Sequence, residues 1–330
     1  MDAERERLAK GYLRFAAEEA SGRSPLYEAL ARGVATDPAV QDFLMSLPAA
    51  KRQPNLLFAA VRHLEGTPEG WYGFRRAILD NAEVLRSLML RRATQTNEPG
   101  RCAALLTVLA GLPPPLALLE VGASAGLCLL PDFYAYDYGG RQLRPSSAGP
   151  DAPVFPCAVD PATPVPAAVP QIVWRAGLDL APIDLADDTE RGWLETLVWP
   201  EQTERLARLR GASRIARRER PRIVRGDLRR DLAPLAAEAP PDATLVVFHT
   251  AVLAYVADRA ERAEFASTVR SLCPFWIANE QAGVFPEIAA KAGPATAPGR
   301  FLLAVTGAPV AWADPHGAAL DWIAAPPATG

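Results

Sequence analysis

The sequence has little lysine, little histidine, no closely spaced cysteine pair and no strong excess of charge. Of its 35 basic residues only Lys10, Lys51 and Lys291 are lysine, which we attribute to coding bias. A net charge of -3 gives no overall attraction to nucleic acid or to an anionic membrane. The four cysteines form no Cys-x-x-Cys pair, which argues against a disulfide framework and against a zinc site.

Long apolar runs are also missing. No segment approaches the length of a membrane span. The charged start, Met1-Asp-Ala-Glu-Arg-Glu-Arg, does not resemble the apolar core of a secretion signal. We therefore expect a soluble, cytoplasmic protein with no membrane contact and no metal site. The sequence gives no indication of the oligomeric state.

What the sequence does contain is enough apolar material for a large core. It has 330 residues, 49% hydrophobic and 22% charged. Residues 1–112 carry helical patterns only, and we assign them to an N-terminal helical domain that ends at Pro113-Pro-Pro115. Ser24-Pro25, Asp37-Pro38 and Gln53-Pro54 each place a polar residue before a proline, as at helix starts.

Strand patterns begin after the proline run. Residues 113–330 are expected to form an α/β domain whose strands alternate with helices, which favours a largely parallel sheet. A Pro-rich and then helical insertion is expected at about residues 145–220. The last strands have no helix between them, which favours an antiparallel edge. The expected strands are Leu116–Val121, 133–138, part of 171–180, 222–225, 244–248, 275–278, 301–306, and 310–312 or 320–323.

The most informative segment is Leu116-Ala-Leu-Leu-Glu-Val-Gly-Ala-Ser-Ala-Gly-Leu. An apolar strand ends in an acid and is followed by a turn of small residues and an apolar segment able to start a helix. Gly122 and Gly126 would let the backbone approach a ligand, and a helix N-terminus would offer free N–H groups. The same letters form Gly-x-Ser-x-Gly around Ser124, the nucleophile-elbow pattern of serine hydrolases.

Polar residues follow every expected strand of the sheet. Because ligands bind beyond the carboxyl ends of parallel strands, these side chains should converge on one crevice. They are Glu120 and the glycine turn, Asp137, Asp227, His249-Thr250 and Asn279-Glu280.

These motifs carry a resemblance. Residues 116–323 resemble the core of class I S-adenosylmethionine-dependent methyltransferases, a Rossmann-like doubly wound sheet. The whole chain resembles an uncharacterised bacterial family of unknown function with the motifs Glu-Val-Gly-Ala-Ser-Ala-Gly-Leu, Tyr-Asp-Tyr-Gly and Trp-Pro-Glu-Gln. The methyltransferase motif is acid-x-Gly-x-Gly-x-Gly, and Ser124 stands here at the middle glycine.

The resemblance implies S-adenosylmethionine as cofactor and a small-molecule methyl acceptor. Glu120 and Gly122 would face the methionine moiety, with Ser124 and Gly126 in the same turn. Asp137 would hold the ribose hydroxyls and Asp227 the adenine amino group. From its position His249 would be a catalytic or substrate-binding residue, and His249 or Glu280 could remove a proton from the acceptor.

Two other interpretations stay open. A serine hydrolase would use Ser124 as nucleophile, with Asp227 then His249, or Glu280 then His316, in the required order. A catalytically silent module would bind a ligand or a protein with the same sheet. Residues 205–230 hold eleven arginines, but without interleaved aromatic residues, so we do not expect a nucleic-acid partner.

Overall fold

The computed structural model describes residues 2–95 and 97–323, and the chain divides into two compact units. One unit contains Met1–Thr96 and Asp187–Leu206, and the other contains Asn97–Ala186 and Ala207–Gly330. The predicted helical region is confirmed, but the division comes before residue 112, because the helix α7 (Arg101–Leu109) belongs to the α/β unit. The expected helical part of the insertion is shared between the units.

The first unit is all helical. Its elements are α1 (Asp2–Arg14), the π-helix η1 (Phe15–Ala20), α2 (Pro25–Thr36), α3 (Pro38–Met45), η2 (Ala49–Lys51), α4 (Pro54–Glu65), α5 (Trp71–Asp80), α6 (Ala82–Arg91) and α8 (Asp188–Thr196). Two of the expected caps are present: the Ser24 hydroxyl accepts from Tyr27 N–H, and the Asp37 carboxylate accepts from two N–H groups. Gln53 precedes α4 without a side-chain cap.

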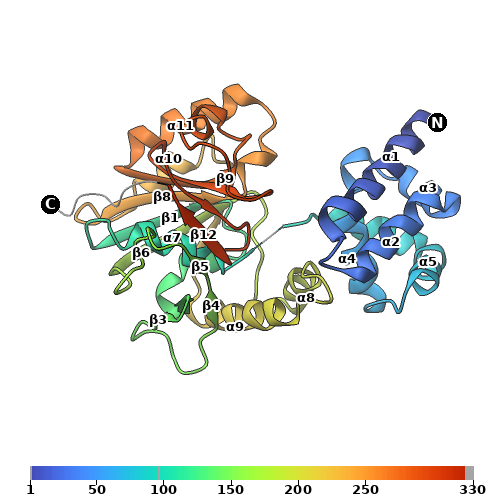
Figure 1. Ribbon diagram of the computed structural model, residues 1–330, viewed down its shortest axis with the longest axis horizontal. Coiled ribbons are helices and arrows are strands. Elements are labelled where there is room, and N and C mark those ends of the chain that lie inside the picture. The colour runs from blue at the N-terminus through green and yellow to red at the C-terminus, as the bar shows by residue number, and fades with distance from the viewer. Residues whose placement is uncertain (1, 96, 324–330) are drawn as a thin grey trace. The chain divides into compact units, whose positions relative to one another are not determined.

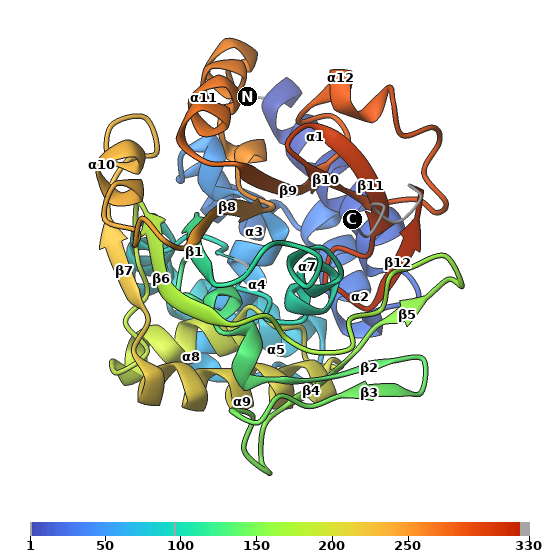
Figure 2. The ribbon, with the colours of Figure 1, turned by 90° about the vertical axis from the view of Figure 1, so that its left-hand side faces the viewer.

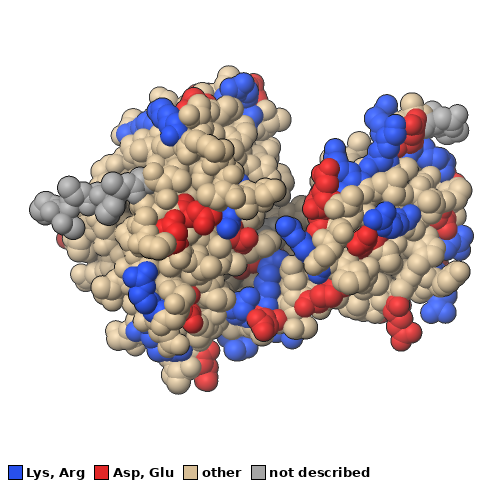
Figure 3. All heavy atoms as spheres, in the orientation of Figure 1, with Lys and Arg blue, Asp and Glu red and all other residues tan. Residues whose placement is uncertain are grey.

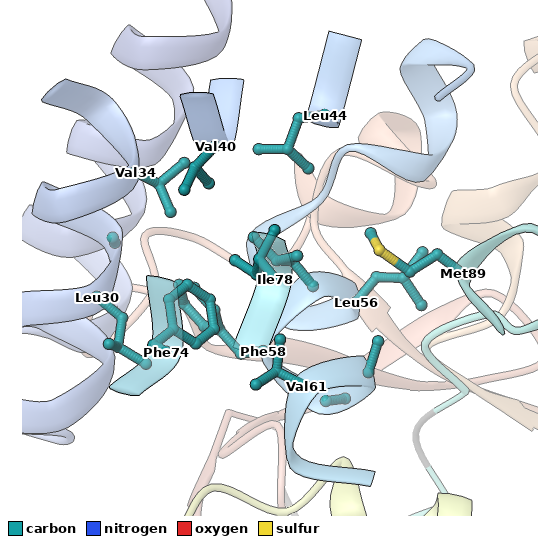
Figure 4. Packing of buried hydrophobic residues seen from close by; sticks show 14 of the residues in the cluster. Leu30, Val34, Val40, Leu44, Leu56, Phe58, Val61, Phe74, Ile78 and Met89 are labelled. Atoms are coloured by element: carbon teal, nitrogen blue, oxygen red, sulfur yellow. The ribbon is translucent and has the colours of Figure 1, made fainter. Parts of the chain in front are cut away.

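The helices of this unit pack around one apolar core. Phe58 from α4 lies at its centre, with its ring centroid 5.5 Å from Phe74 and 4.7 Å from Tyr27. Figure 4 shows Leu30, Ile78 and other aliphatic side chains filling the space around it. Because these side chains come from helices throughout residues 2–95, the unit has its own core.

The second unit contains a nine-stranded mixed sheet in the order β5-β12-β11-β10-β9-β8-β1-β6-β7 (Figures 1 and 2). The strands β7, β6, β1, β8 and β9 are parallel, and β10 to β12 continue as an antiparallel meander, as expected for the edge. Their bounds are β1 Leu116–Val121, β5 Ala158–Val159, β6 Ile172–Asp179, β7 Arg222–Arg225, β8 Thr244–Thr250, β9 Phe275–Gln281, β10 Phe301–Val305, β11 Ala308–Ala313 and β12 Ala319–Trp322.

Helices cover both faces of this sheet. The helices α10 (Leu232–Ala236) and α11 (Arg259–Leu272) pack on one face, and α7 lies on the opposite face (Figures 1 and 2). The remaining elements are a small sheet of β2 (Ala135–Tyr138), β3 (Arg141–Leu143) and β4 (Val154–Pro156), with the helices η3 (Leu127–Leu129), η4 (Pro131–Phe133), α9 (Thr203–Glu219), η5 (Leu253–Tyr255) and α12 (Pro286–Ala289). The outcome is a mixed α/β fold with a large, mostly parallel central sheet.

Two local expectations are wrong. The strand at residues 133–138 forms as β2, but it belongs to the small sheet, and the neighbour of β1 is β6. The glycine turn is followed by a three-residue 3-10 helix, Leu127–Leu129, and then by a second short one, so no α-helix N-terminus faces the turn. The anion-binding helix start that the sequence suggested is therefore missing from this position.

Candidate functional site

The carboxyl edge of the parallel strands contains a topological switch point at β1. The chain runs from β1 to β6 and β7 on one side, and then returns to β8 and β9 on the other. In open α/β sheets, ligands bind in the crevice at such a point. The side chains that follow β1, β6, β8 and β9 therefore define the candidate site.

Glu120, near the end of β1, is the most unusual residue of this edge. Its side chain points to the side of the sheet that α7 covers, and the residue is only 3% exposed. Its Oε2 has no hydrogen-bond partner within the described residues. Burial raises the pKa of this carboxyl well above its ordinary value; Cys128 and Asp179 add to the rise, and Arg101 opposes it.

Arg101, in the first turn of α7, is the second buried charge of the site. Its side chain donates from Nε to the Pro315 carbonyl at 2.8 Å. Its Nη1 donates to the carbonyl and the hydroxyl of Thr250, at the end of β8. The guanidinium also lies over the Phe301 ring, 5.9 Å from its centroid. Sequence reasoning missed Arg101, although an arginine that begins an otherwise apolar helix was a usable signal.

Asp179 is the acid that follows the strand next to β1. Its Oδ2 accepts from Ser124 N–H at 2.8 Å, and its Oδ1 accepts from Ala181 N–H at 2.7 Å. The sequence assigned this place to Asp137, and the structure does not support that assignment. Asp137 lies in β2 of the small sheet, where its Oδ1 accepts from Gly140 N–H in a hairpin.

The glycine turn itself is tightly packed by side chains. A Cβ at Gly122, whose φ is +73°, would lie 2.3 Å from Val252 Cγ2. A Cβ at Gly126, whose φ is +70°, would lie 2.6 Å from Ile223 Cδ1. Both glycines are therefore required by a left-handed backbone and by close neighbours from the loop after β8 and from β7. The sequence predicts that a ligand can approach the backbone at Gly122. In the structure, the Val252 side chain occupies that space.

Several buried polar atoms at this edge of the sheet have no hydrogen-bond partner within the described residues. In the glycine turn, Ser124 adopts φ +51°, and its Oγ is one of them. Asn97 donates from Nδ2 to the Ala123 carbonyl at 2.9 Å, but its Oδ1 accepts no bond from any described residue. Two strands away, in β9, both amide atoms of Asn279 are also unpartnered within the described part of the chain. Buried polar atoms are rarely left unsatisfied, so a cluster of them indicates a place where a ligand or water binds.

His249 and Glu280 lie on the other face of the sheet. His249 is fully buried against Phe265 of α11. Trp276 Nε1 donates to His249 Nε2 at 2.9 Å; because an indole only donates, the imidazole proton is assigned to Nδ1. That Nδ1–H donates to Glu280 Oε1 at 2.7 Å. Both ring nitrogens are therefore occupied, and the geometry favours a structural role over general-base catalysis.

Glu280 connects this buried pair to the edge of the sheet. The same Oε1 accepts from the N–H groups of Val252 at 2.8 Å and of Leu253 at 3.0 Å. The preceding residue, Ala251, has φ +57°, which is uncommon for a residue with a Cβ. Glu280 thus holds the loop whose Val252 side chain rests on Gly122.

The remaining candidates lie further from β1. Asp227 follows the edge strand β7, and its Oδ1 accepts from the backbone N–H and Nε of Arg229. These bonds lower the pKa of the Asp227 carboxyl, and the bond from the backbone N–H has the largest effect. For the hydrolase interpretation, Ser124 Oγ has no bonded imidazole in the described part of the chain. His316 lies 3.6 Å from a Glu98 carboxylate oxygen, measured from Nδ1.

Residues 2–95 and 97–323 contain no group of three or more His, Cys, Asp or Glu side chains placed to hold a metal ion. No helix among them combines the length and the apolar character needed to cross a membrane.

Comparisons with known proteins identify one family. Its description is "Uncharacterized protein conserved in bacteria (DUF2332)", and it matches residues 9–322. No curated protein and no solved structure matches the chain. The match extends over both units, including the helices before the sheet and the glycine turn. The chain therefore belongs to this family of uncharacterised bacterial proteins, as its motifs predict.

Proposed function

We propose that the α/β unit binds S-adenosylmethionine at the β1 edge and transfers its methyl group to a small-molecule acceptor. The observation that carries the proposal is the buried Glu120 carboxylate, unpartnered at Oε2, in the field of the buried Arg101 guanidinium at the switch point. The strand order β7-β6-β1-β8-β9 and the acid-x-Gly-x-Ser-x-Gly turn support the same choice.

The residues of this edge fit the charged groups of the cofactor. Its methionine part carries an ammonium and a carboxylate. The Arg101 guanidinium offers the opposite charge to the carboxylate, and the ammonium would favour loss of the Glu120 proton and pair with the carboxylate that results. The Nε and Nη1 donors of Arg101 are already bonded to Pro315 and Thr250, so its Nη2 donors are the ones that would bind the carboxylate. Asp179 accepts two backbone N–H bonds, but a carboxylate has about four lone-pair sites, so it can also accept from ribose hydroxyls.

One feature of the structure does not fit a bound cofactor. The Val252 side chain lies against Gly122 and fills the space in which a ligand would approach the glycine turn. Binding therefore requires the loop at residues 251–256 to move away from the turn, which breaks the Val252 and Leu253 bonds to Glu280. The strained Ala251 backbone, at φ +57°, stores free energy that such a movement would release.

The bound cofactor would supply an activated methyl group on its sulfonium sulfur. Such a donor needs alignment with the acceptor more than covalent assistance. In this proposal Glu120, Arg101 and Asp179 bind and orient the cofactor. His249 is a positioning residue that holds Glu280 and through it the loop, and no described residue is assigned as the base.

The first test is binding of S-adenosylhomocysteine, the product form of the cofactor, by calorimetry and by thermal shift. Ligand at about 100 times its Kd should stabilise the fold by about 2.7 kcal/mol. Glu120→Gln keeps the shape of the side chain but removes its charge, and should weaken binding at least tenfold. Asp137→Asn is the matched control and should bind as the wild type does.

Each other result has a defined meaning. No stabilisation by S-adenosylhomocysteine, or equal weakening by Glu120→Gln and Asp137→Asn, contradicts the site. Binding without transfer of labelled methyl groups to any component of a bacterial small-molecule extract would favour the silent module. Labelling of Ser124 by a fluorophosphonate would favour the hydrolase.

A further inference from the structure

The helical unit contains a cavity that the proposed methyl transfer does not use. Its volume is about 400 Å³, within the range of small-molecule sites. It lies between α1 and η1 on one side and η2 with the start of α4 on the other. All the residues that line it belong to the helical unit, so it is separate from the β1 edge.

The lining of the cavity contains apolar residues and, within the described residues, one buried hydroxyl without a hydrogen-bond partner. The apolar lining residues include Leu8, Phe15 and Pro54. Tyr12 is part of the same wall, is only 1% exposed, and its hydroxyl has no partner within the described residues. A buried hydroxyl without a partner is unfavourable, so the wall at Tyr12 is not packed as a fully satisfied core.

A π-helix forms one side of the cavity. The segment η1 continues directly from α1, and its end is closed by the bond from Ser21 N–H to the Ala16 carbonyl, five residues back. π-Helical turns are rare and are frequent at functional sites. Phe15 and Glu19, both within η1, line the cavity. The irregular backbone therefore coincides with the cavity wall.

Arginines outnumber acids in the lining of the cavity, which contains Arg7, Arg14 and Arg52 with Glu4 and Glu19. Arg7 and Arg14 are exposed and lie on the same side of α1 as Gly11, which is between them in the sequence. A third arginine, Arg52, is neutralised by Glu4, to which it donates at 2.5 Å. Partial burial raises the pKa of the Glu19 carboxyl in the same lining. Figure 3 shows basic side chains gathered over α1 with acidic ones between them.

We propose that this cavity is a second ligand site, which takes an organic carboxylate with an aromatic or medium-chain apolar body. The body packs against Leu8, Phe15 and Pro54. The carboxylate lies at the rim between Arg7 and Arg14, where both guanidiniums can donate to it. The site is independent of methyl transfer, because the residues concerned lie in the other unit.

The test uses 1-anilinonaphthalene-8-sulfonate, an aromatic anion whose sulfonate replaces the carboxylate. The folded wild-type protein should bind one equivalent with a saturable rise in fluorescence. Gly11→Leu should weaken this binding at least tenfold, because Gly11 lines the cavity and a Cβ there meets no atom within 4 Å, so the larger side chain would take up cavity space. As a leucine in a helix it should also raise the melting temperature, so lost binding would not reflect unfolding.

Gly73→Leu is the matched control. Gly73 lies within α5, a Cβ there also meets no atom within 4 Å, and the residue is outside the cavity lining. This variant should bind the probe as the wild type does. Equal affinity of the wild type and Gly11→Leu, or no saturable binding by the wild type, would overturn the proposal.

Two competitors test the ligand class and the independence of the site. Octanoate should displace the probe, and octanol at the same concentration should displace it at least fivefold less effectively. Equal displacement by the two would overturn the role of the carboxylate. Saturating S-adenosylhomocysteine should leave probe binding unchanged, and competition between the two would overturn the assignment to the helical unit.

Discussion

The two faces of the sheet differ in how their buried polar groups are bonded. On the α11 face, both nitrogens of His249 are bonded, to Trp276 and Glu280, and Glu280 Oε1 accepts three bonds. Glu280 Oε2 has no partner within the described residues, and the same is true of Glu120 Oε2 on the α7 face, one position from His249 in strand register. The α7 face differs because Asn279 also leaves both amide atoms unpartnered there, within the same described residues. Bonded polar groups stabilise a fold, whereas several unsatisfied ones on one face are available to a ligand, which favours the α7 face as the candidate binding site.

The largest effect should come from the structural face. His249→Ala removes an imidazole that is fully buried, leaves the Trp276 N–H without its acceptor, and opens a cavity. We expect a loss of about 3 kcal/mol in the free energy of unfolding, measured by urea denaturation. Binding of S-adenosylhomocysteine to the folded fraction should not weaken, because His249 holds the closed loop through Glu280 and does not itself bind the ligand.

A double-mutant cycle provides the control for this prediction. His249 and Glu280 share a direct bond, so His249→Ala with Glu280→Ala should cost less than the sum of the two single variants. Additive losses would show that the pair is not coupled. A tenfold loss of ligand affinity in folded His249→Ala would show that His249 contributes to ligand binding.

The second effect concerns pH on the opposite face. The pKa of Glu120 is raised in the folded protein, so the folded state holds this proton where the unfolded state has lost it. Stability is then fully present below the ordinary value of 4.5 and falls as pH rises toward the raised pKa, by up to about 1.4 kcal/mol per pH unit. Urea denaturation of the wild type and Glu120→Gln at several pH values measures the difference.

Glu120→Gln should flatten this pH dependence, because an amide does not titrate. It should also match or exceed the wild type in stability above pH 7, where burial of a charged carboxylate costs most. Parallel stability curves for the two proteins would show that Glu120 is not the residue responsible. Such a result would weaken the contrast between the two faces.

Much of the fold could be predicted from sequence, because local pattern determined it. The strands at 222–225 and 301–306 were expected nearly where they occur. The partner of β1 could not be predicted, since strand pairing depends on contacts between distant segments. Residues 135–138 of the expected segment 133–138 do form a strand, and only the tertiary arrangement shows that 172–179 lies beside β1.

The candidate site was predictable to a similar extent. Glu120 and Gly122 were found because a motif in one short segment carries them. Arg101 and Asp179 come from separate segments, and Asp179 had no signal beyond its place at the end of a strand that the sequence showed only weakly. The bonding of His249 could not be predicted, because sequence position gives only the end of a strand, whereas the bonds of both ring nitrogens depend on Trp276 and Glu280.

The smallest expected effect concerns the loop at residues 251–256, which follows β8 at the edge of the sheet. Val252→Ala removes the methyl groups that rest on Gly122 and should cost about 1 kcal/mol of stability, because the side chain is half-buried. It should also raise the affinity for S-adenosylhomocysteine about fivefold, since less apolar contact is lost when the loop moves away. Calorimetry measures both the affinity and the accompanying enthalpy.

Val256→Ala is the matched control at the other end of the same loop. Val256 is also a half-buried valine packed against the core of the sheet, but it is not among the nearest atoms to Gly122. A similar loss of stability without a gain in affinity would locate the effect at the Val252–Gly122 contact. A gain in both variants would instead indicate general loosening of the loop, and a gain in neither would show that the glycine turn is not where the ligand enters.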